Sequence, residues 1–367
     1  MRARPARTVQ GRSKRDLQKG ERAVADSQGR RIIAVEEHFA TTRYWEQTAS
    51  LAASAGEDAE RAYGRSFVEN AIISRRLSDL QTRLDEMDQS GVDLSVLSLN
   101  PPGVQLWRDP EKATSLAREM NDALAGIVAG HPDRFAPLAA VAPQDPEGAA
   151  EEIRRAMGTL GFGGVLIGSH TGGRYLDEPQ FEPILAALEE TDATLYLHPR
   201  MPSPEMLEPF NPYGLQQAIW GFQAEAGTHA MRLIMSGVFD RHPNLRVVLG
   251  HMGEGIPYWL WRTDNLHKKS YAWARDVLHM VKLELTPSEY FKRNFWITTS
   301  GMFDPDVLNY GLAKVGAERV LFAVDYPYED SNVATEFLAK AGLSDEQRSA
   351  ISHGNAERLF GVPSTAA

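Results

Sequence analysis

Eight short, almost continuously apolar runs recur along the chain, and each ends at a turn residue or a polar side chain. They lie at residues 31–39, 93–100, 135–143, 163–169, 194–199, 245–251, 295–301 and 319–327. Short runs rich in Val, Ile and Leu are typical of strands that are buried on both faces, as in a parallel sheet. The pattern therefore predicts eight parallel strands.

Helical periodicity fills the intervals between these runs. It covers residues 74–91, 111–130, 146–161 and 180–191, and a further helix is expected at 344–361, after an N-cap serine. Alternation of eight strands with helices predicts an α/β protein with a single (β/α)8 TIM barrel. A doubly wound open sheet is the alternative, but no glycine-rich phosphate loop follows the first run.

Two connections, residues 40–73 and 252–294, are longer than a barrel requires. Segments that follow barrel strands lie over the C-terminal mouth, where substrate pockets form. We therefore expect both connections to shape a pocket.

The distribution of charge separates the start of the chain from the rest. Residues 1–31 hold ten Lys or Arg and three acidic residues, whereas the chain of 367 residues has a net charge of −10. A basic segment with few apolar residues is typical of disordered chain. We predict a basic N-terminal extension over residues 1–30, disordered or packed as an arm, and one barrel domain over residues 31–362.

Composition narrows the classes of function. Apolar residues make up 43% of the chain, yet no apolar run approaches the roughly 18–20 residues that span a membrane. The acidic net charge argues against nucleic acid as the main partner. The sequence has no cysteine, which excludes disulfides and thiolate ligands and suits a cytoplasmic location.

Potential metal ligands stand at the ends of three predicted strands. Glu36 and His38 share one face of the first strand, because side chains alternate along a strand. His198 ends the fifth strand and Asp325 the eighth. Each could alone be a structural residue, but strand ends converge at the mouth of a barrel. Imidazole and carboxylate without sulfur suit Zn²⁺ or Mn²⁺, so we predict one mononuclear site.

Further ionisable residues follow the sixth strand. His251 is either a fifth ligand or an acid/base, and Glu254 either orients it or only decorates a helix N-terminus. Arg262 lies eight residues after Glu254, about two turns along the same helical face. It is either an anion clamp or an exposed arginine.

The chain resembles the metal-dependent, non-oxidative aromatic acid decarboxylases of the amidohydrolase superfamily. These include γ-resorcylate, 2,3-dihydroxybenzoate and 5-carboxyvanillate decarboxylases and, more distantly, aminocarboxymuconate semialdehyde decarboxylase. The resemblance runs from about residue 31 to residue 360. It is carried by the strings EEHF, DPEKATSLAREMNDALA, HPDRFAPLAAVAPQDP, GSHTGGRYLDEPQFEPI, YLHPR, SGVFDRHPNLRVVLGHMGEGIPYWLWR, ITTSG and VDYPYE.

The resemblance implies a function for several of the residues above. It implies that the metal is held by Glu36, His38, His198 and Asp325. It also implies that His251 is catalytic and supported by Glu254, that Arg262 is near the substrate, and that the protein is a homodimer or homotetramer. Some strings are closest to 5-carboxyvanillate decarboxylase, whereas His38 is typical of the resorcylate type, so the acid itself stays open.

The reaction implied is loss of CO2 from a hydroxylated aromatic carboxylic acid of the o-hydroxybenzoate type. We expect Asp325 to protonate the carboxylated ring carbon, so that CO2 leaves as aromaticity returns. Tyr326, Tyr328 and Trp45 are candidates for the aromatic walls of the pocket, although such residues also pack ordinary loops.

Two other functions stay open, and the first of them would use the same metal ligands. A metal-dependent hydrolase would open a lactone or an amide and give a product one water heavier, instead of CO2 and a phenol. A non-catalytic barrel would bind a ligand or partner through its basic arm.

Overall fold

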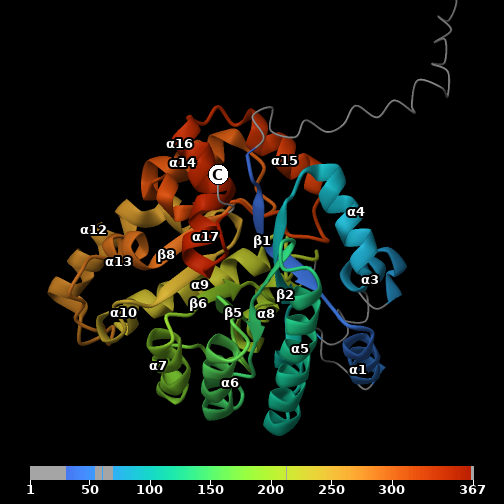
Figure 1. Ribbon diagram of the computed structural model, residues 1–367. Helices are drawn as coiled ribbons and strands as arrows, with labels where there is room; N and C mark the ends of the chain where they lie inside the picture. Colours follow the sequence, from blue (N-terminus) through green and yellow to red (C-terminus); the bar gives the residue numbers. More distant parts are fainter. Residues whose placement is uncertain (1–29, 54–59, 61–68, 212, 365–367) are drawn as a thin grey trace, which may run out of the picture.

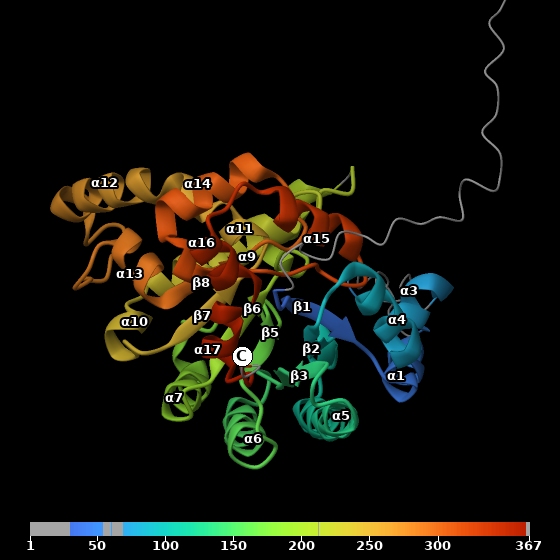
Figure 2. The same cartoon turned by 45° about the horizontal axis from the view of Figure 1, so that its top comes forward.

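Parallel strands form the centre of the molecule and helices surround them, as Figures 1 and 2 show. The computed structural model describes residues 30–53, 60, 69–211 and 213–364. The strands are β1 (Ile33–Phe39), β2 (Leu94–Leu99), β3 (Phe135–Pro137), β4 (Ala139–Ala140), β5 (Gly164–Gly168), β6 (Thr194–His198), β7 (Arg246–Leu249), β8 (Phe295–Thr298) and β9 (Val320–Leu321). Each of the eight apolar runs contains a strand, and the third run contains both β3 and β4.

The strands close into a barrel. They pair in the order β1-β2-β3 and β4-β5-β6-β7-β8-β9, always in parallel. The two sets join where the Leu138 N–H, between β3 and β4, donates to the Leu97 carbonyl at 2.8 Å. At the other seam the Val35 N–H donates to the Phe322 carbonyl at 3.2 Å. The predicted (β/α)8 architecture is thereby confirmed.

The helices follow the strands along the chain. They are α1 (Thr42–Ala53), α3 (Ala71–Ser78), α4 (Leu80–Ser90), α5 (Pro110–Gly130), α6 (Pro146–Gly158), α7 (Glu182–Glu190), α8 (Pro204–Leu207), α9 (Gly221–Met235), α10 (Val238–Arg241), α11 (His251–Glu254), α12 (Ile256–Ala274), α13 (Pro287–Asn294), α14 (Pro305–Val315), α15 (Ser331–Lys340), α16 (Asp345–Ser349) and α17 (Asn355–Phe360). A π-helical turn, Ala350–Gly354, joins α16 to α17.

The helix expected over residues 74–91 is two helices, α3 and α4, which meet at Asp79. Its carboxylate accepts the N–H groups of Gln81 and Thr82 at 3.0 and 3.4 Å and caps the start of α4. Aspartate competes for backbone N–H groups in this way and favours a helix start over a helix interior. The apolar periodicity did not reveal this break.

The C-terminal helix closes one end of the barrel. Inward-facing residues of the strands form a buried cluster with Leu359 and Phe360 of α17. The hydroxyl of Thr194, the first residue of β6, donates to the Leu359 carbonyl at 3.0 Å. α17 therefore lies against the N-terminal ends of the strands and leaves their C-terminal ends for the site.

Two further expectations concern the N-terminal extension and membrane-spanning helices. The basic extension expected over residues 1–30 lies outside the described residues, apart from Arg30. Among the helices that the structure describes, none combines the length and the hydropathy needed to cross a bilayer.

Candidate metal centre and active site

Glu36 and His38 reach the mouth of the barrel through an irregularity in β1. The register of β1 against β2 shifts between Ala34 and Glu37, so that two residues of β1 oppose one of β2. Such a bulge turns the residues that follow it. Val35 packs in the barrel interior and Glu36, directly after it, also faces the metal site. Without the bulge, plain alternation would send Glu36 to the outer face.

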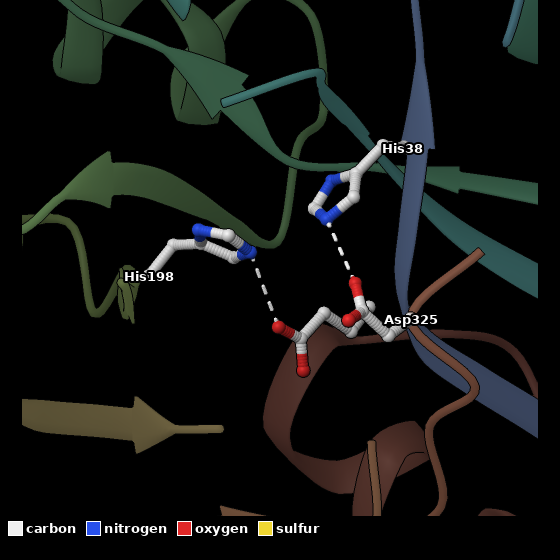
Figure 3. Close-up of side chains that lie close together, drawn as sticks. His38, His198 and Asp325 are labelled. Atoms are coloured by element: carbon white, nitrogen blue, oxygen red, sulfur yellow. Dashed lines mark ion pairs between the residues drawn. The ribbon is translucent and has the colours of Figure 1, made fainter. Parts of the chain in front are cut away.

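The four predicted ligands converge. Glu36, His38, His198 and Asp325 each offer a donor atom, and the four atoms lie within 4.8 Å of one another. His38 Nε2 lies 3.5 Å from Asp325 Oδ1, and His198 Nε2 lies 3.2 Å from Glu36 Oε1. Figure 3 shows the His38 and His198 rings pointing into the same space as the Asp325 carboxylate.

The donor atoms fit a divalent cation. Glu36 Oε1, His38 Nε2 and His198 Nε2 are buried and have no hydrogen-bond partner. Such atoms carry a desolvation cost unless an ion or another group compensates it. The other ring nitrogens are held: His198 Nδ1 donates to the Pro199 carbonyl at 2.7 Å, and His38 Nδ1 lies 2.9 Å from Ser98 Oγ. This leaves Nε2 of His198 unprotonated, with its lone pair directed at the other ligands.

Glu36 is kept ionised. Burial raises the pKa of Glu36, but positive His251 and the neighbouring His198 outweigh it and lower that pKa to about 2. Its second oxygen, Oε2, accepts hydrogen bonds from the Tyr196 hydroxyl and, at 3.3 Å, from Thr298 Oγ1. Glu36 is therefore an oriented carboxylate, which is the form that binds a cation.

His251 and Glu254 form a pair beside the four ligands. His251 Nδ1 lies 2.8 Å from Glu254 Oε1, and His251 Nε2 lies 3.7 Å from Asp325 Oδ2. Burial lowers the pKa of His251, but the charges of Glu254 and Glu36 and the interaction with the Asp325 carboxylate outweigh it and raise that pKa well above its usual value. The imidazole is thus oriented from one side and faces Asp325 with the other.

The backbone is strained at the residues that carry this chemistry. His251, Glu254 and Asp325 have φ angles of 48°, 50° and 76°. Residues other than glycine rarely adopt this left-handed region, and such strain concentrates at functional sites. His251 to Glu254, the α11 turn, therefore differs from the ordinary helix start that the sequence suggested.

A cavity of about 1010 Å³ opens on the cluster, and His198, His251 and Asp325 line it. Both long connections contribute to its wall, Glu60 from the first and Trp259 from the second. Apolar side chains dominate the rest, among them Trp220, Phe222, Met231 and Met302. A mostly apolar cavity of this size accepts a small organic ligand, with the polar groups at one end fixing its orientation.

The structure brings Tyr328 to the cavity but not three other residues expected there. Arg262 is exposed on α12 and is not part of the cavity wall. Gly255, with φ 76°, ends one helical segment, and α12 starts at Ile256. Glu254 and Arg262 therefore do not share a helical face, which is why the spacing argument fails for Arg262.

Trp45 and Tyr326 are buried beside the barrel and do not line the cavity either. Trp45 packs against Tyr44 in α1, with ring centres 5.7 Å apart. The guanidinium groups of Arg76 and Arg83 both pack over the Tyr326 ring. Both aromatic residues have the packing role that was the alternative for them.

Sequence reasoning missed two residues of the site, Tyr196 and Arg200. Tyr196 donates to the ligand Glu36, and Arg200 lines the cavity. Each is two residues from His198, so the two-residue period of a strand could have placed all three on one face. A ligand considered singly does not reveal the neighbours that share its face of the strand.

Comparison with known proteins agrees with this geometry. The family model described as Amidohydrolase matches residues 74–362. γ-Resorcylate decarboxylase from Rhizobium sp. (strain MTP-10005) is 37% identical over 336 residues, which cover 89% of this chain and 97% of that protein.

Two solved structures are also similar. 5-Carboxyvanillate decarboxylase from Novosphingobium aromaticivorans DSM 12444, complexed with manganese and 4-hydroxy-3-methoxy-5-nitrobenzoic acid, has a TM-score of 0.87 and 38% identity, covering 91% of this chain and 97% of that one. Dihydroxybenzoic acid decarboxylase from Polaromonas sp. JS666, with manganese and the inhibitor 2-nitroresorcinol, has a TM-score of 0.78 and 36% identity, covering 90% and 97%.

The fold and the site define a TIM-barrel protein whose strand ends are built to hold one divalent cation. The chain belongs to the amidohydrolase family. The resemblance to its aromatic acid decarboxylases, stated from the sequence, is confirmed.

Proposed function

We propose that the protein is a metal-dependent, non-oxidative decarboxylase of a hydroxylated aromatic carboxylic acid. The observation that carries the proposal is the convergence of Glu36, His38, His198 and Asp325, within 4.8 Å, at one end of an apolar cavity. Relatives that are at least 36% identical over nine-tenths of the chain are decarboxylases of such acids. This favours decarboxylation over the hydrolase, whose ligands would be the same.

The metal would be held by Glu36, His38, His198 and Asp325. When bound there, a divalent ion would supply Lewis acidity that stabilises negative charge on a hydroxybenzoate substrate. Manganese is present in the two related structures. We propose Mn²⁺ ahead of Zn²⁺ on that ground, since the nitrogen and oxygen donors suit both ions.

Proton transfer is assigned to residues that face the same space. Asp325 would deliver a proton to the carboxylated ring carbon, after which CO2 departs and the ring regains its aromaticity. His251 lies 3.7 Å from Asp325 Oδ2 and is oriented by Glu254, so it can pass a second proton, taken up from solvent, to that oxygen and replace the one that stays on the ring. Tyr328 would form part of the aromatic wall. We do not extend the proposal to Arg262, Tyr326 or Trp45.

We also propose a cytoplasmic homo-oligomer. The lack of cysteine suits a reducing compartment. The helix α12 exposes large aromatic side chains, with Tyr258, Trp261 and Trp273 more than 70% exposed. Clusters of exposed apolar residues mark interaction surfaces. A second copy of the chain, which would cover them, is the partner we propose.

The function is tested with protein loaded with Mn²⁺ and a panel of o-hydroxybenzoates that includes 2,6-dihydroxybenzoate and 5-carboxyvanillate. From at least one acid of this panel we expect CO2 and the matching phenol in equal amounts, and no product after the metal is removed by a chelator. Lactones and amides of the same ring systems serve as the second panel. Hydrolysis of that panel, with no CO2 from the first, would overturn the proposal.

A further inference from the structure

Arg200 is a buried arginine in the wall of the cavity. Its side chain is only 4% exposed. Its Nη1 donates to the His170 carbonyl at 2.6 Å. Its Nε and Nη2 both donate to the carboxylate of Glu60, the first at 2.8 Å. The two-pronged fork of Arg200, the geometry in which arginine binds carboxylates most strongly, is therefore already filled from within the chain.

Glu60 competes with any ligand carboxylate that approaches Arg200. Because Glu60 belongs to the same chain, it meets Arg200 at an effective concentration on the order of millimolar or above. A ligand carboxylate at lower concentration would have to displace it. Arg200 also favours keeping this partner, because a buried charge without one is strongly unfavourable. In the native chain, the charge of Arg200 is thus neutralised by Glu60 and is not free to bind a ligand carboxylate.

The other charged side chains in the described part of the cavity wall give a second carboxylate no better position. Arg232 is the other arginine among the described residues of the wall. Its Nε and Nη2 donate to the two oxygens of Asp177 at 2.8 and 2.9 Å. Glu329 adds a further carboxylate to the wall. Among the wall residues that the structure describes, a carboxylate that enters beyond the metal site would lose its water without gaining an unpaired arginine.

We propose that Glu60 is a specificity-determining residue. By occupying Arg200, it restricts the cavity to hydroxybenzoates that have one carboxyl group and otherwise neutral ring substituents. The apolar side chains of Trp220, Phe222 and Met302, which line the same cavity, suit such neutral substituents. The inference rests on the proposed function, because it concerns the substrate that this site takes.

The test compares two probes that differ by one carboxylate. 4-Hydroxy-3-methoxy-5-nitrobenzoate and 2-methoxy-6-nitrophenol share a phenol beside a nitro group, whose oxygens stand in for the carboxylate that would be lost. Only the first has a second anionic group on the ring. The dissociation constants of both are measured with Mn²⁺-loaded protein, so the readout needs no turnover.

We expect native protein to bind the nitrophenol more tightly than the nitrobenzoate. Glu60→Gln frees Arg200, so the nitrobenzoate should gain about tenfold in affinity, the value of one charge-assisted hydrogen bond. The affinity for the nitrophenol should stay within about twofold. The double variant with Arg200→Met should lose the gain, because no cation is then left to receive the carboxylate.

Glu329→Gln is the matched control, because it removes one carboxylate from the same wall without freeing Arg200. An equal gain in Glu329→Gln, or no change of the affinity ratio in Glu60→Gln, would overturn the inference. If Glu60→Gln is unstable in thermal melting, Glu60→Asp keeps a charge near Arg200 but has a shorter reach. It should give a smaller gain in the same direction, and an unchanged ratio would again overturn the inference.

The outcome separates the inference from the function on which it rests. Release of CO2 together with an unchanged affinity ratio would retain the function and reject the role of Glu60. The expected change of the affinity ratio without CO2 release would retain the role of Glu60 in excluding a second carboxylate and would reject the decarboxylase function. If native Mn²⁺-loaded protein binds neither probe, both are rejected.

Discussion

The guanidinium group of Arg83 lies 4.1 Å from the centre of the Tyr326 ring. Tyr326 directly follows the metal-site residue Asp325 in the sequence. The same guanidinium donates to the carbonyl of His38, and Arg83 as a whole is only 1% exposed. Arg83 therefore connects the end of β1 to the segment after β9, which together supply three of the four ligands. Arg83 therefore helps to hold the ligands of these two segments at the right distance from one another.

We expect Arg83→Met to weaken Mn²⁺ binding by about 10- to 100-fold, as loss of groups that orient metal ligands usually does. Metal affinity is measured by titration with a competing chelator, alongside thermal melting. Arg76→Met is the control, because Arg76 lies 4.4 Å from the same ring but bonds the Pro327 carbonyl instead of that of His38. A lower melting temperature with unchanged affinity would show that Arg83 only stabilises the fold.

Removal of the metal should destabilise the whole barrel. Glu36, His38 and His198 bury donor atoms that have no hydrogen-bond partner, so a cation bound there stabilises the folded state only. At a free concentration 100 times the dissociation constant, the gain is about 2.7 kcal/mol. We expect Mn²⁺ to raise the melting temperature of chelator-treated protein.

His198→Ala should abolish this rise. His242→Gln provides a control elsewhere in the molecule, since His242 also contacts carboxylates, those of Glu182 and Glu189, at 2.8 and 2.9 Å. That variant should melt earlier but respond to Mn²⁺ as the native protein does. A response that persists in His198→Ala would place the metal at another site.

Replacement of His251 should separate metal binding from proton transfer. His251→Asn removes the group that faces Asp325 Oδ2 but none of the four ligands. We expect bound Mn²⁺ to be retained and CO2 release to fall by about 100- to 10,000-fold, the range for loss of a general acid or base. His353→Asn is the matched control, because His353 pairs with Glu357 at 3.2 Å outside the cavity. Retained turnover in His251→Asn would remove His251 from the mechanism.

The exposed aromatic face of α12 gives a prediction about assembly. The mass of the native protein in solution, measured by light scattering, should be a multiple of the 40.7 kDa chain. Trp261→Lys should shift it toward the single chain, because a lysine would be buried without a partner in the interface. Val333→Lys, on the half-exposed surface of α15, is the control and should leave the mass unchanged. A native protein of 40.7 kDa would contradict the oligomer.

The strands and the metal ligands were predictable from the sequence because both depend on local features. Continuous apolar runs identify buried parallel strands, and polar residues that end several such runs come together at the mouth of a barrel. Asp325 and His198 were found in this way. The bulge in β1 was not found, although it decides that Glu36 faces the barrel interior, because no local pattern marks it.

The errors arose where an argument extended a regular period across a break. Asp79 divides a helix that the apolar pattern shows as continuous, and Gly255 divides the segment between Glu254 and Arg262. The ion pair of Arg200 with Glu60 joins residues 140 positions apart. Such long-range pairs depend on the folded topology, and a single sequence without the fold does not specify them.

Two buried histidines predict how stability depends on pH. His229 Nε2 accepts the N–H of Leu176 at 3.0 Å, and His170 Nδ1 accepts that of Gly173 at 3.2 Å. Burial lowers the pKa of both histidines to about 3, with smaller contributions from Arg232 for His229 and from Arg200 for His170. Each ring is therefore neutral when folded, and protonation would break the bond from the backbone.

In the unfolded chain these histidines have a pKa of about 6.5, so below that pH the unfolded state binds more protons than the folded state. Their contribution to stability is complete above pH 6.5 and decreases as the pH falls toward 3. Each histidine should add about 1.4 kcal/mol per pH unit to the slope. Urea unfolding at roughly pH 5.5 and 4.5, about one and two units below the unfolded pKa, measures this slope of the unfolding free energy with pH. In His229→Gln, whose amide can still accept the Leu176 N–H, the slope should fall by about that amount. A slope equal to that of the native protein would show that His229 is already protonated in the folded state.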